Sequence, residues 1–239
     1  MIKPQQAIKI QKYKMKKQKN NVLVIGDTHI PFEHSDYLKF CINIGKQNKC
    51  NQVIHIGDLV DMHSCSYHEH DPDLWSPSQE MEIADKHLKS WFKAFPKIKL
   101  CLGNHDRLPD RKRRTVGLPS RCFRSFHEMW DLPKGWQSDF NFIIDDVIYE
   151  HGTGSSGRYA HLNLAIANRQ STVVGHNHSM SGIEYTASEK DCIFGMNVGS
   201  GVNRKALAFA YGRNFKFKPI VSCGVVFNGE NPQIFRMKL

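Results

Sequence analysis

The chain has 239 residues, of which 40% are hydrophobic and 23% are charged, as is ordinary for a globular domain. No apolar run approaches the roughly 20 residues of a membrane-spanning helix, and the N-terminus lacks the charged-then-apolar layout of a secretory signal. The seven cysteines include no C-x-x-C pair, which favours reduced thiols. We therefore expect a cytoplasmic protein with no membrane partner.

The formal net charge of +10 is concentrated in two segments. Residues 1–20 carry seven lysines and no acidic residue, which is typical of a flexible basic tail. Residues 21–239 have the length of a single domain. Within this domain, residues 107–124 hold six arginines and one lysine but only one acid, Asp110. We therefore expect a basic loop and helix inserted near 107–137.

The first half of the chain alternates short β-branched runs with amphipathic helical patterns. In order, the expected elements are strand 22–26, helix 36–46, strand 52–56, helix 77–95 and strand 98–102. This alternation predicts a parallel sheet covered by helices.

The Arg-Lys-Arg-Arg run at 111–114 lies among Pro109, Gly117 and Pro119. Such punctuation indicates a loop, followed by a helix near 120–130. Beyond 140 the pattern becomes rich in strands, with one helix at 157–168 and a hairpin turn at Asn228-Gly229. The expected strands are 140–144, 147–149, 172–174, 182–185, 192–198, 220–227 and 233–237.

Five of the expected strands end in motifs that carry acidic, amide and imidazole side chains. The motifs are Asp27-Thr28-His29, Gly57-Asp58-Leu59-Val60-Asp61, Gly103-Asn104-His105-Asp106, Glu150-His151-Gly152 and Gly175-His176-Asn177-His178. In open α/β sheets, ligands bind beyond the carboxyl ends of the strands. We therefore expect the five motifs to converge on one site.

These side chains predict a metal centre. Carboxylate, amide and imidazole donors without thiolates suit Mn²⁺, Fe or Zn²⁺. A single histidine more often makes only a structural hydrogen bond, but seven candidate ligands in five strand-end motifs favour two ions that share a carboxylate. His105 is then left for proton transfer. The seven candidates are Asp27, His29, Asp58, Asn104, His151, His176 and His178.

With these residues in view, the chain resembles the calcineurin-like metallophosphoesterase superfamily, whose pattern is D-x-H, G-D-x-x-D, G-N-H-D/E, H and G-H-x-H. All five blocks are present in this order. The resemblance implies an α/β fold, a four-layer α/β/β/α sandwich of two mixed sheets flanked by helices. Within the superfamily, the chain resembles the compact phage and bacterial type, which is related to SbcD-type nucleases and cyclic-nucleotide phosphodiesterases.

The resemblance also implies roles for the motif residues. Two divalent ions would be bound, Mn²⁺ in first place, with Fe, Zn²⁺, Ni²⁺ and Mg²⁺ as alternatives. His105 matches the catalytic histidine of the family, and either Asp61 or Asp106 would orient it. One ion would be held by Asp27, His29 and His178, the second by Asn104, His151 and His176, and Asp58 would bridge them.

The basic residues that follow the third motif are candidates for substrate binding. Arginine forks bind phosphate oxygens in a bidentate manner, so a basic segment beside a metal centre fits a phosphate-rich substrate. The alternative is a solvated charge run, the usual fate of such segments. The candidates are Arg107, Arg111, Lys112, Arg113 and Arg114.

We expect a phosphodiesterase or nuclease that acts on nucleic acid. The alternative is a nucleotide phosphatase, or a phosphodiesterase acting on cyclic nucleotides or other small molecules; a non-catalytic scaffold is a third possibility. Protein phosphatases of the superfamily carry Arg-Gly where this chain has Met62-His63, and lipid-A-type pyrophosphatases carry Arg in place of His105. The expected partner is therefore nucleic acid or a nucleotide, and the sequence carries no signal for an oligomeric state.

Overall fold

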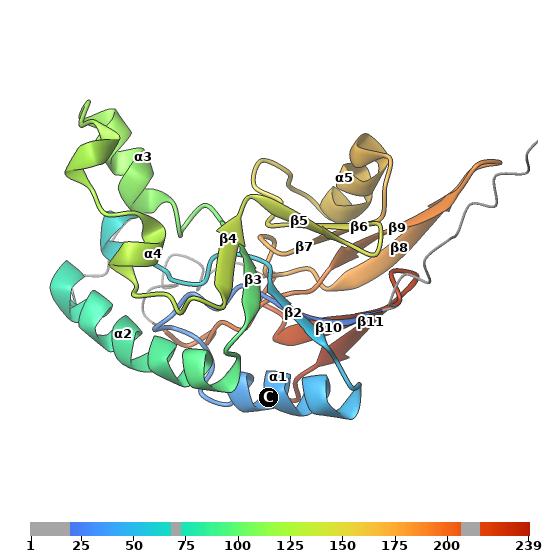
Figure 1. Ribbon diagram of the computed structural model, residues 1–239, viewed down its shortest axis with the longest axis horizontal. Coiled ribbons are helices and arrows are strands. Elements are labelled where there is room, and N and C mark those ends of the chain that lie inside the picture. Colours follow the sequence, from blue (N-terminus) through green and yellow to red (C-terminus); the bar gives the residue numbers. More distant parts are fainter. Residues whose placement is uncertain (1–19, 68–72, 207–215) are drawn as a thin grey trace, which may run out of the picture.

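The computed structural model describes residues 20–67, 73–206 and 216–239, so all of the expected N-terminal tail except Asn20 lies outside the described residues. Two mixed β-sheets form the centre of the fold (Figure 1). The first has the strand order β11-β10-β1-β2-β3-β4, and β1 to β4 are parallel. Its strands are β1 (Asn21–Ile25), β2 (Gln52–His55), β3 (Ile98–Cys101), β4 (Trp136–Asp139), β10 (Ser222–Phe227) and β11 (Asn231–Arg236).

The second sheet has five strands in the order β5-β6-β7-β9-β8. Its central strands β6, β7 and β9 are parallel, and the two edge strands are antiparallel to their neighbours. Its strands are β5 (Asn141–Ile144), β6 (Val147–Glu150), β7 (Thr172–Val174), β8 (Gly182–Ala187) and β9 (Cys192–Asn197).

Helices cover both outer faces and complete the predicted four-layer α/β/β/α sandwich. Helices α1 (Tyr37–Gln47) and α2 (Pro77–Ala94) lie against the first sheet, and α5 (Ala160–Asn168) lies against the second (Figure 1). Among the helices of the described ranges, none is long and apolar enough to cross a membrane.

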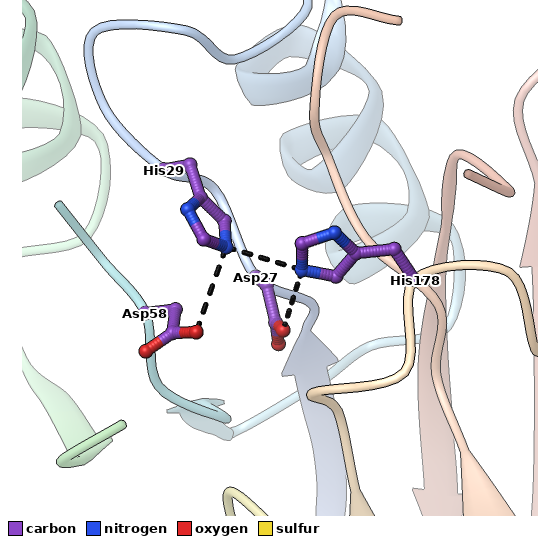
Figure 2. Close-up of side chains that lie close together, drawn as sticks. All are labelled: Asp27, His29, Asp58 and His178. Carbon is purple, nitrogen blue, oxygen red and sulfur yellow. Dashed lines mark hydrogen bonds and ion pairs between the residues drawn. The ribbon is translucent and has the colours of Figure 1, made fainter. Parts of the chain in front are cut away.

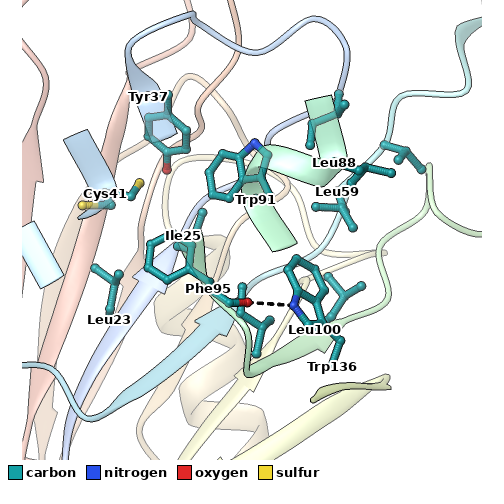
Figure 3. Packing of buried hydrophobic residues seen from close by; sticks show 14 of the residues in the cluster. Leu23, Ile25, Tyr37, Cys41, Leu59, Leu88, Trp91, Phe95, Leu100 and Trp136 are labelled. Carbon is teal, nitrogen blue, oxygen red and sulfur yellow. Dashed lines mark hydrogen bonds between the residues drawn. The ribbon is translucent and has the colours of Figure 1, made fainter. Parts of the chain in front are cut away.

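Strand β1 is buried on both sides because successive side chains of a strand point to opposite faces. Leu23 and Ile25 pack in the layer between the first sheet and its helices, where Trp91 of α2 is also buried (Figure 3). Val22 and Val24 pack in the layer between the two sheets. This double burial explains the continuous apolar run, and it fixes the end of β1, from which the first ligand motif begins.

The predicted helix from residue 77 is α2, and a capping box sets its first turn. The Gln79 N–H donates to Ser76 Oγ, while the Ser76 N–H donates to Gln79 Oε1. Pro77 stands at the first helical position, where its missing N–H loses no hydrogen bond. The first turn thereby fixes Glu80, a buried acid that supports the site described below.

The prediction of a loop at 111–114 is wrong, because these residues belong to helix α3 (Leu108–Thr115). Pro109 lies in the first turn, where proline is tolerated. Asp110 accepts a hydrogen bond from Arg113 Nε at 2.7 Å and pairs with Arg114 at 2.9 Å. An acid in the first turn and bases in the last turn also suit the helix dipole. The charge run that indicated a loop therefore stabilises a helix.

The helix expected over 120–130 is also wrong in extent. The structure has a 3₁₀ turn at Ser120–Cys122 and a four-residue helix, α4 (Phe126–Met129), which begins with a capping box. The chain then enters β4, an edge strand that was not predicted. Figure 1 shows α3 and α4 on the β4 side of the first sheet, and residues of both helices line one cavity.

Candidate metal centre

The loops that follow β1, β2, β3, β6 and β7 meet at one edge of the sandwich. Among the described residues, three groups of side-chain atoms there each lie within 4.8 Å of one another. One of them is His29, Asp61 and His105, and the other two share Asp58. The first group is Asp27, His29, Asp58 and His178, and the second is Asp58, His151 and His176. The strand-end motifs therefore converge, although Asp27 and His178 are 151 positions apart.

The first group surrounds the end of β1, and its four side chains point toward one another (Figure 2). His178 Nε2 lies 3.1 Å from Asp27 Oδ2 and 3.1 Å from His29 Nε2. His29 Nε2 lies 3.5 Å from Asp58 Oδ2. Two carboxylates and two imidazoles from three separate loops thus present nitrogen and oxygen atoms to a common space.

The second group is centred on His151. Its Nε2 atom lies 3.0 Å from Asn104 Oδ1, 3.1 Å from His176 Nδ1 and 3.2 Å from Asp58 Oδ2. The other ring nitrogen, Nδ1, lies 3.1 Å from the carbonyl oxygen of Ile56. That contact fixes the ring, so that Nε2 is directed at the neighbouring ligand atoms. The structure thereby brings all seven predicted metal ligands together.

The donor atoms of the first group fit a divalent cation. Burial, together with His105 and His178, holds the pKa of His29 well below its usual range, so the ring is neutral at neutral pH. Its Nδ1 lies 2.5 Å from Asp61 Oδ1 and donates its single proton there, which leaves the Nε2 lone pair directed at His178. Asp27 Oδ1 is buried and has no hydrogen-bond partner. A divalent cation in this space would take up the Nε2 lone pair of His29 and would neutralise the buried Asp27 carboxylate, whose unpaired Oδ1 is otherwise costly.

The second group also fits a divalent cation, because the carboxylates around His151 favour a positive charge there. Burial disfavours the imidazolium of His151, but Asp58 and Asp27 outweigh this effect and raise its pKa to about 10. Burial likewise disfavours the charged carboxylate of Asp58, yet His151 and His105 hold its pKa well below the usual range. A divalent ion bound beside His151 would take the place of the proton that these carboxylates favour on its ring.

Two glycines of the motifs make room for the ligand carboxylates. A Cβ atom on Gly103 would overlap the carboxylate and main-chain nitrogen of Asp58. A Cβ atom on Gly175 would overlap Oδ1 of Asp27. The glycines that precede Asn104 and His176 are therefore required by the close approach of a neighbouring ligand, rather than by the turn alone.

Asp61 contacts both the ligand shell and the candidate catalytic histidine. Its carboxylate binds His29 Nδ1, as described above, and its carbonyl oxygen lies 2.6 Å from His105 Nδ1. The His105 and His29 rings have centroids 4.5 Å apart. Burial disfavours the charged form of His105, but Asp58 and Asp61 outweigh it and raise its pKa above the usual value. Asp61 is therefore the acid that holds both rings in place.

Asp106, the other candidate for orienting His105, binds the main chain. Its carboxylate accepts hydrogen bonds from the Gly103 N–H at 2.9 Å and the Val60 N–H at 3.2 Å. Burial and the nearby Asp58 raise its pKa to about 7. Asp106 thus links the loops that follow β2 and β3, the two loops that supply Asp58 and Asn104.

Glu80 is a supporting residue that the motifs did not reveal. Its carboxylate accepts hydrogen bonds from the His63 N–H at 2.8 Å and the Ser64 N–H at 3.2 Å, which anchors the turn after Asp61. Its position four residues before Ala84, on the buried face of α2, was the available signal. An acid within an apolar helical stripe indicates a buried hydrogen bond.

His55 is a second supporting residue without a motif. Its Nε2 lies 3.0 Å from Thr28 Oγ1, and its Nδ1 accepts from the Gly57 N–H at 3.2 Å. Burial lowers its pKa to about 3, so the ring is neutral and can both donate and accept. It joins the loops that carry the first two ligand motifs. A histidine at the end of an otherwise apolar strand was its signal in the sequence.

The five candidate substrate-binding residues fall into three environments. Arg113 and Arg114 pair with Asp110. The Arg107 guanidinium lies 4.8 Å from the centroid of the Phe140 ring. Both Arg111 and Lys112 lie over the ring of Tyr67, at 5.2 and 3.9 Å from its centroid.

Comparison with solved structures finds similar chains at low sequence identity. A metallophosphoesterase from Sphaerobacter thermophilus has 16% identity and a TM-score of 0.45, covering 92% of this chain and 88% of its own. Vacuolar protein sorting 29 from Cryptosporidium parvum has 13% identity and a TM-score of 0.45, covering 92% and 99%. The nuclease MPE of Pseudomonas putida has 13% identity and a TM-score of 0.34, covering 90% and 87%.

A search of curated proteins finds no match. Residues 21–192, more than half of the chain, match the protein family described as calcineurin-like phosphoesterase. This range contains all five strand-end motifs and every side chain of the candidate metal centre. The chain therefore belongs to the calcineurin-like phosphoesterase family.

Proposed function

We propose that the protein is a metal-dependent phosphodiesterase that cleaves nucleic acid. Membership of the calcineurin-like phosphoesterase family supports a phosphoester hydrolase that uses divalent metal ions. The observation that carries the proposal is the shared carboxylate: Asp58 belongs to both groups of converging ligand atoms. Two adjacent cation sites joined by one carboxylate are the arrangement of two-metal phosphatases and nucleases.

In this proposal the two groups of ligands hold one ion each. Asp27, His29 and His178 would hold the first, Asn104, His151 and His176 would hold the second, and Asp58 would be shared by both. When bound, the ions would activate a water molecule as the nucleophile and neutralise charge on the phosphoryl oxygens. Imidazole, carboxylate and amide donors favour Mn²⁺, with Fe, Zn²⁺, Ni²⁺ and Mg²⁺ as alternatives.

His105 is the general acid of the proposed reaction. Its ring lies beside the ligand His29, and its Nδ1 is held by the carbonyl oxygen of Asp61. The Nε2 atom is therefore the one that delivers a proton to the leaving oxygen of the substrate. Asp61 acts by positioning, since it fixes His105 and His29 together.

Nucleic acid is the proposed substrate because cations gather next to the centre. Helix α3 begins two residues after Asp106 and presents Arg111 and Lys112 over the ring of Tyr67, which is 55% exposed. These cations suit the repeated phosphates of a polymer. The seven free cysteines support a reducing compartment such as the cytoplasm.

A metal-supplemented activity panel tests the proposal. Purified protein with Mn²⁺ is expected to cleave single- or double-stranded DNA or RNA, and EDTA is expected to abolish cleavage. Cyclic nucleotides and nucleoside monophosphates are included as competing substrates. Hydrolysis of these small molecules without cleavage of any polymer would replace the nuclease proposal by the nucleotide-directed alternative. Activity that survives complete metal removal would contradict the metal-dependent mechanism.

A further inference from the structure

A cavity of about 400 Å³ lies between α3, the 120–126 segment, α4 and Phe140. It adjoins the third ligand motif, because Leu102 and Asp106, which flank Gly103 to His105, form part of its lining. Its volume lies within the roughly 300–1,000 Å³ of small-molecule sites. None of its lining residues is a ligand of the proposed metal centre.

The cavity combines aromatic surface with arginine side chains. Phe123 and Phe140 line it and remain 41% and 55% exposed. Large aromatic rings left this open at a concave surface are typical of binding sites. The Arg107 guanidinium lies over the Phe140 ring, and Arg124 contributes a second cation.

The acidic residues of the lining are already engaged. Asp110 pairs with Arg113 and Arg114, and Asp106 accepts two main-chain hydrogen bonds. Glu128 accepts from the N–H and the hydroxyl of Ser125 in the cap of α4. Arg107 and Arg124 have no ion pair among the described residues. The cavity therefore offers Arg107, whose guanidinium lies over the Phe140 ring, and a second cation, Arg124.

We propose that this cavity binds the nucleotide next to the scissile phosphodiester, with its base against Phe123 and Phe140 and its phosphate at Arg107. Aromatic rings stack on nucleobases of any sequence, and arginine binds phosphate through paired N–H donors. The inference rests on the proposed function, since it names the part of a nucleic-acid substrate that lies beside the metal centre. The aromatic contacts predict that the base contributes affinity, which the phosphate alone would not explain.

The first experiment measures binding by calorimetry to the metal-loaded protein, with AMP and ribose 5-phosphate as ligands. AMP is expected to bind at least tenfold more tightly than ribose 5-phosphate. Phe123→Ala should weaken AMP binding about tenfold and leave ribose 5-phosphate binding unaltered, whereas Arg107→Gln should weaken both. Equal affinities for the two ligands, or an unaltered AMP affinity in Phe123→Ala, would overturn the inference.

Matched variants separate these effects from general damage to the fold. Phe123→Leu keeps an apolar side chain but removes the aromatic face, so it should weaken AMP binding as Phe123→Ala does. Arg236→Gln and Ile143→Ala change an exposed arginine and an exposed apolar side chain outside the cavity. Both are expected to bind AMP as the unaltered chain does. If either control lost AMP binding, the weaker binding of the cavity variants could not be assigned to the cavity.

A kinetic experiment distinguishes this inference from the proposed function. Thymidine 5′-(p-nitrophenyl phosphate) and methyl p-nitrophenyl phosphate share a leaving group, but only the first has a base. The ratio of their kcat/KM values is expected to fall about tenfold in Phe123→Ala. Hydrolysis of both esters with an unchanged ratio would remove the cavity site and retain a phosphodiesterase. Hydrolysis of neither ester would contradict the proposed function, while the calorimetry would still decide whether the cavity binds a base.

Discussion

At the scale of single residues, Asp58 is the side chain on which both halves of the metal centre depend. Its Oδ2 atom lies 3.2 Å from His151 Nε2 and 3.5 Å from His29 Nε2. Asp58→Asn removes the negative charge that both cation sites share, so we expect metal content and activity to be lost together. Elemental analysis after dialysis, combined with a phosphodiester assay, measures both. The control is Asp85→Asn, an exposed acid on α2; full metal content in Asp58→Asn would contradict the shared-ligand assignment.

Substitution of His105 should affect activity but not metal content, because the proposed role of His105 is to donate a proton and not to bind an ion. We expect His105→Ala to keep both ions but to lower turnover by about 10²–10⁴-fold on substrates whose leaving group needs a proton. The loss should be smaller with p-nitrophenyl esters, since p-nitrophenolate leaves without protonation. Parallel assays on an oligonucleotide and bis-p-nitrophenyl phosphate, with metal analysis, make the comparison. An equal loss on both substrates would exclude the general-acid role.

Asp61 provides a test of positioning through a ligand. Its carboxylate accepts a hydrogen bond from His29 Nδ1 at 2.5 Å, and such contacts to a metal-binding histidine typically account for a 10–100-fold difference in metal affinity. We expect Asp61→Ala to weaken binding of one ion by about that factor. Asp61→Asn keeps an acceptor oxygen and should retain more of the affinity. Competition with a metal-binding dye measures the metal affinity of each variant. If both variants bound metal as tightly as the unaltered protein, the hydrogen bond to His29 would have no such role.

At the scale of elements, the loops after the strands are shaped by contacts between them. Gly103 lies against the Asp58 carboxylate, and an added Cβ would overlap it. Gly103→Ala should therefore displace a metal ligand and destabilise the fold by about 1–3 kcal/mol, as overpacking usually does. The control is Gly154→Ala, at φ +90 with open space around it: its backbone strain costs stability but should spare metal binding. Thermal melting and metal analysis separate the two effects, and a fully metal-loaded Gly103→Ala would show that the loop can yield.

Elements with a strong periodic pattern could be predicted from the sequence. Strand β1 was predicted because its residues form one apolar run, and α2 because its apolar residues recur in an amphipathic helical pattern; the structure buries both. Helix α3 could not be recognised in this way, because its stability comes from pairs between Asp110 and the arginines one turn later. Strand β4 has no clear alternation and is defined by its parallel pairing with β3.

The members of the candidate site could be predicted because their positions follow from the predicted strands. Each candidate ligand follows a strand end, and the rule for parallel sheets places such ends together, so the seven candidate side chains were expected to meet, and they do lie together. The contacts that orient them join loops distant in sequence, as Asp61 does with His29 across 32 positions. No local pattern encodes such a contact. The sequence therefore predicted which side chains meet, but not which of Asp61 and Asp106 contacts His105.

At the scale of the whole molecule, one stretch of chain supplies several parts of the proposed activity. Between Leu102 and Phe140 lie one proposed metal ligand, the histidine proposed as the acid, the basic helix α3 and the lining of the cavity proposed to bind a nucleotide. The rest of the sandwich holds the other ligands at the ends of buried strands. We infer that this stretch joins part of the proposed chemistry to the selection of the substrate, whereas the other strand ends supply the remaining candidate ligands.

The basic surface then predicts how nucleic-acid binding responds to salt. Arg111 and Lys112 lie over Tyr67, and each contact to a phosphate adds about 0.7–0.9 to the slope of log affinity against log salt concentration. Changing both to Gln should lower that slope by about 1.4–1.8 and reduce cleavage of oligonucleotides more than hydrolysis of bis-p-nitrophenyl phosphate. Fluorescence anisotropy of a labelled oligonucleotide at several salt concentrations gives the slope.

The matched control removes the same charge elsewhere. Arg169 and Arg236 are exposed residues outside α3, so changing both to Gln lowers the net charge equally without touching the proposed contacts. If binding followed net charge alone, both double variants would shift the slope alike, and the assignment to α3 would fail. Removal of residues 1–19 tests the remaining source of positive charge, the seven lysines before the folded domain. A slope that falls only on this truncation would move the phosphate contacts from α3 to the tail.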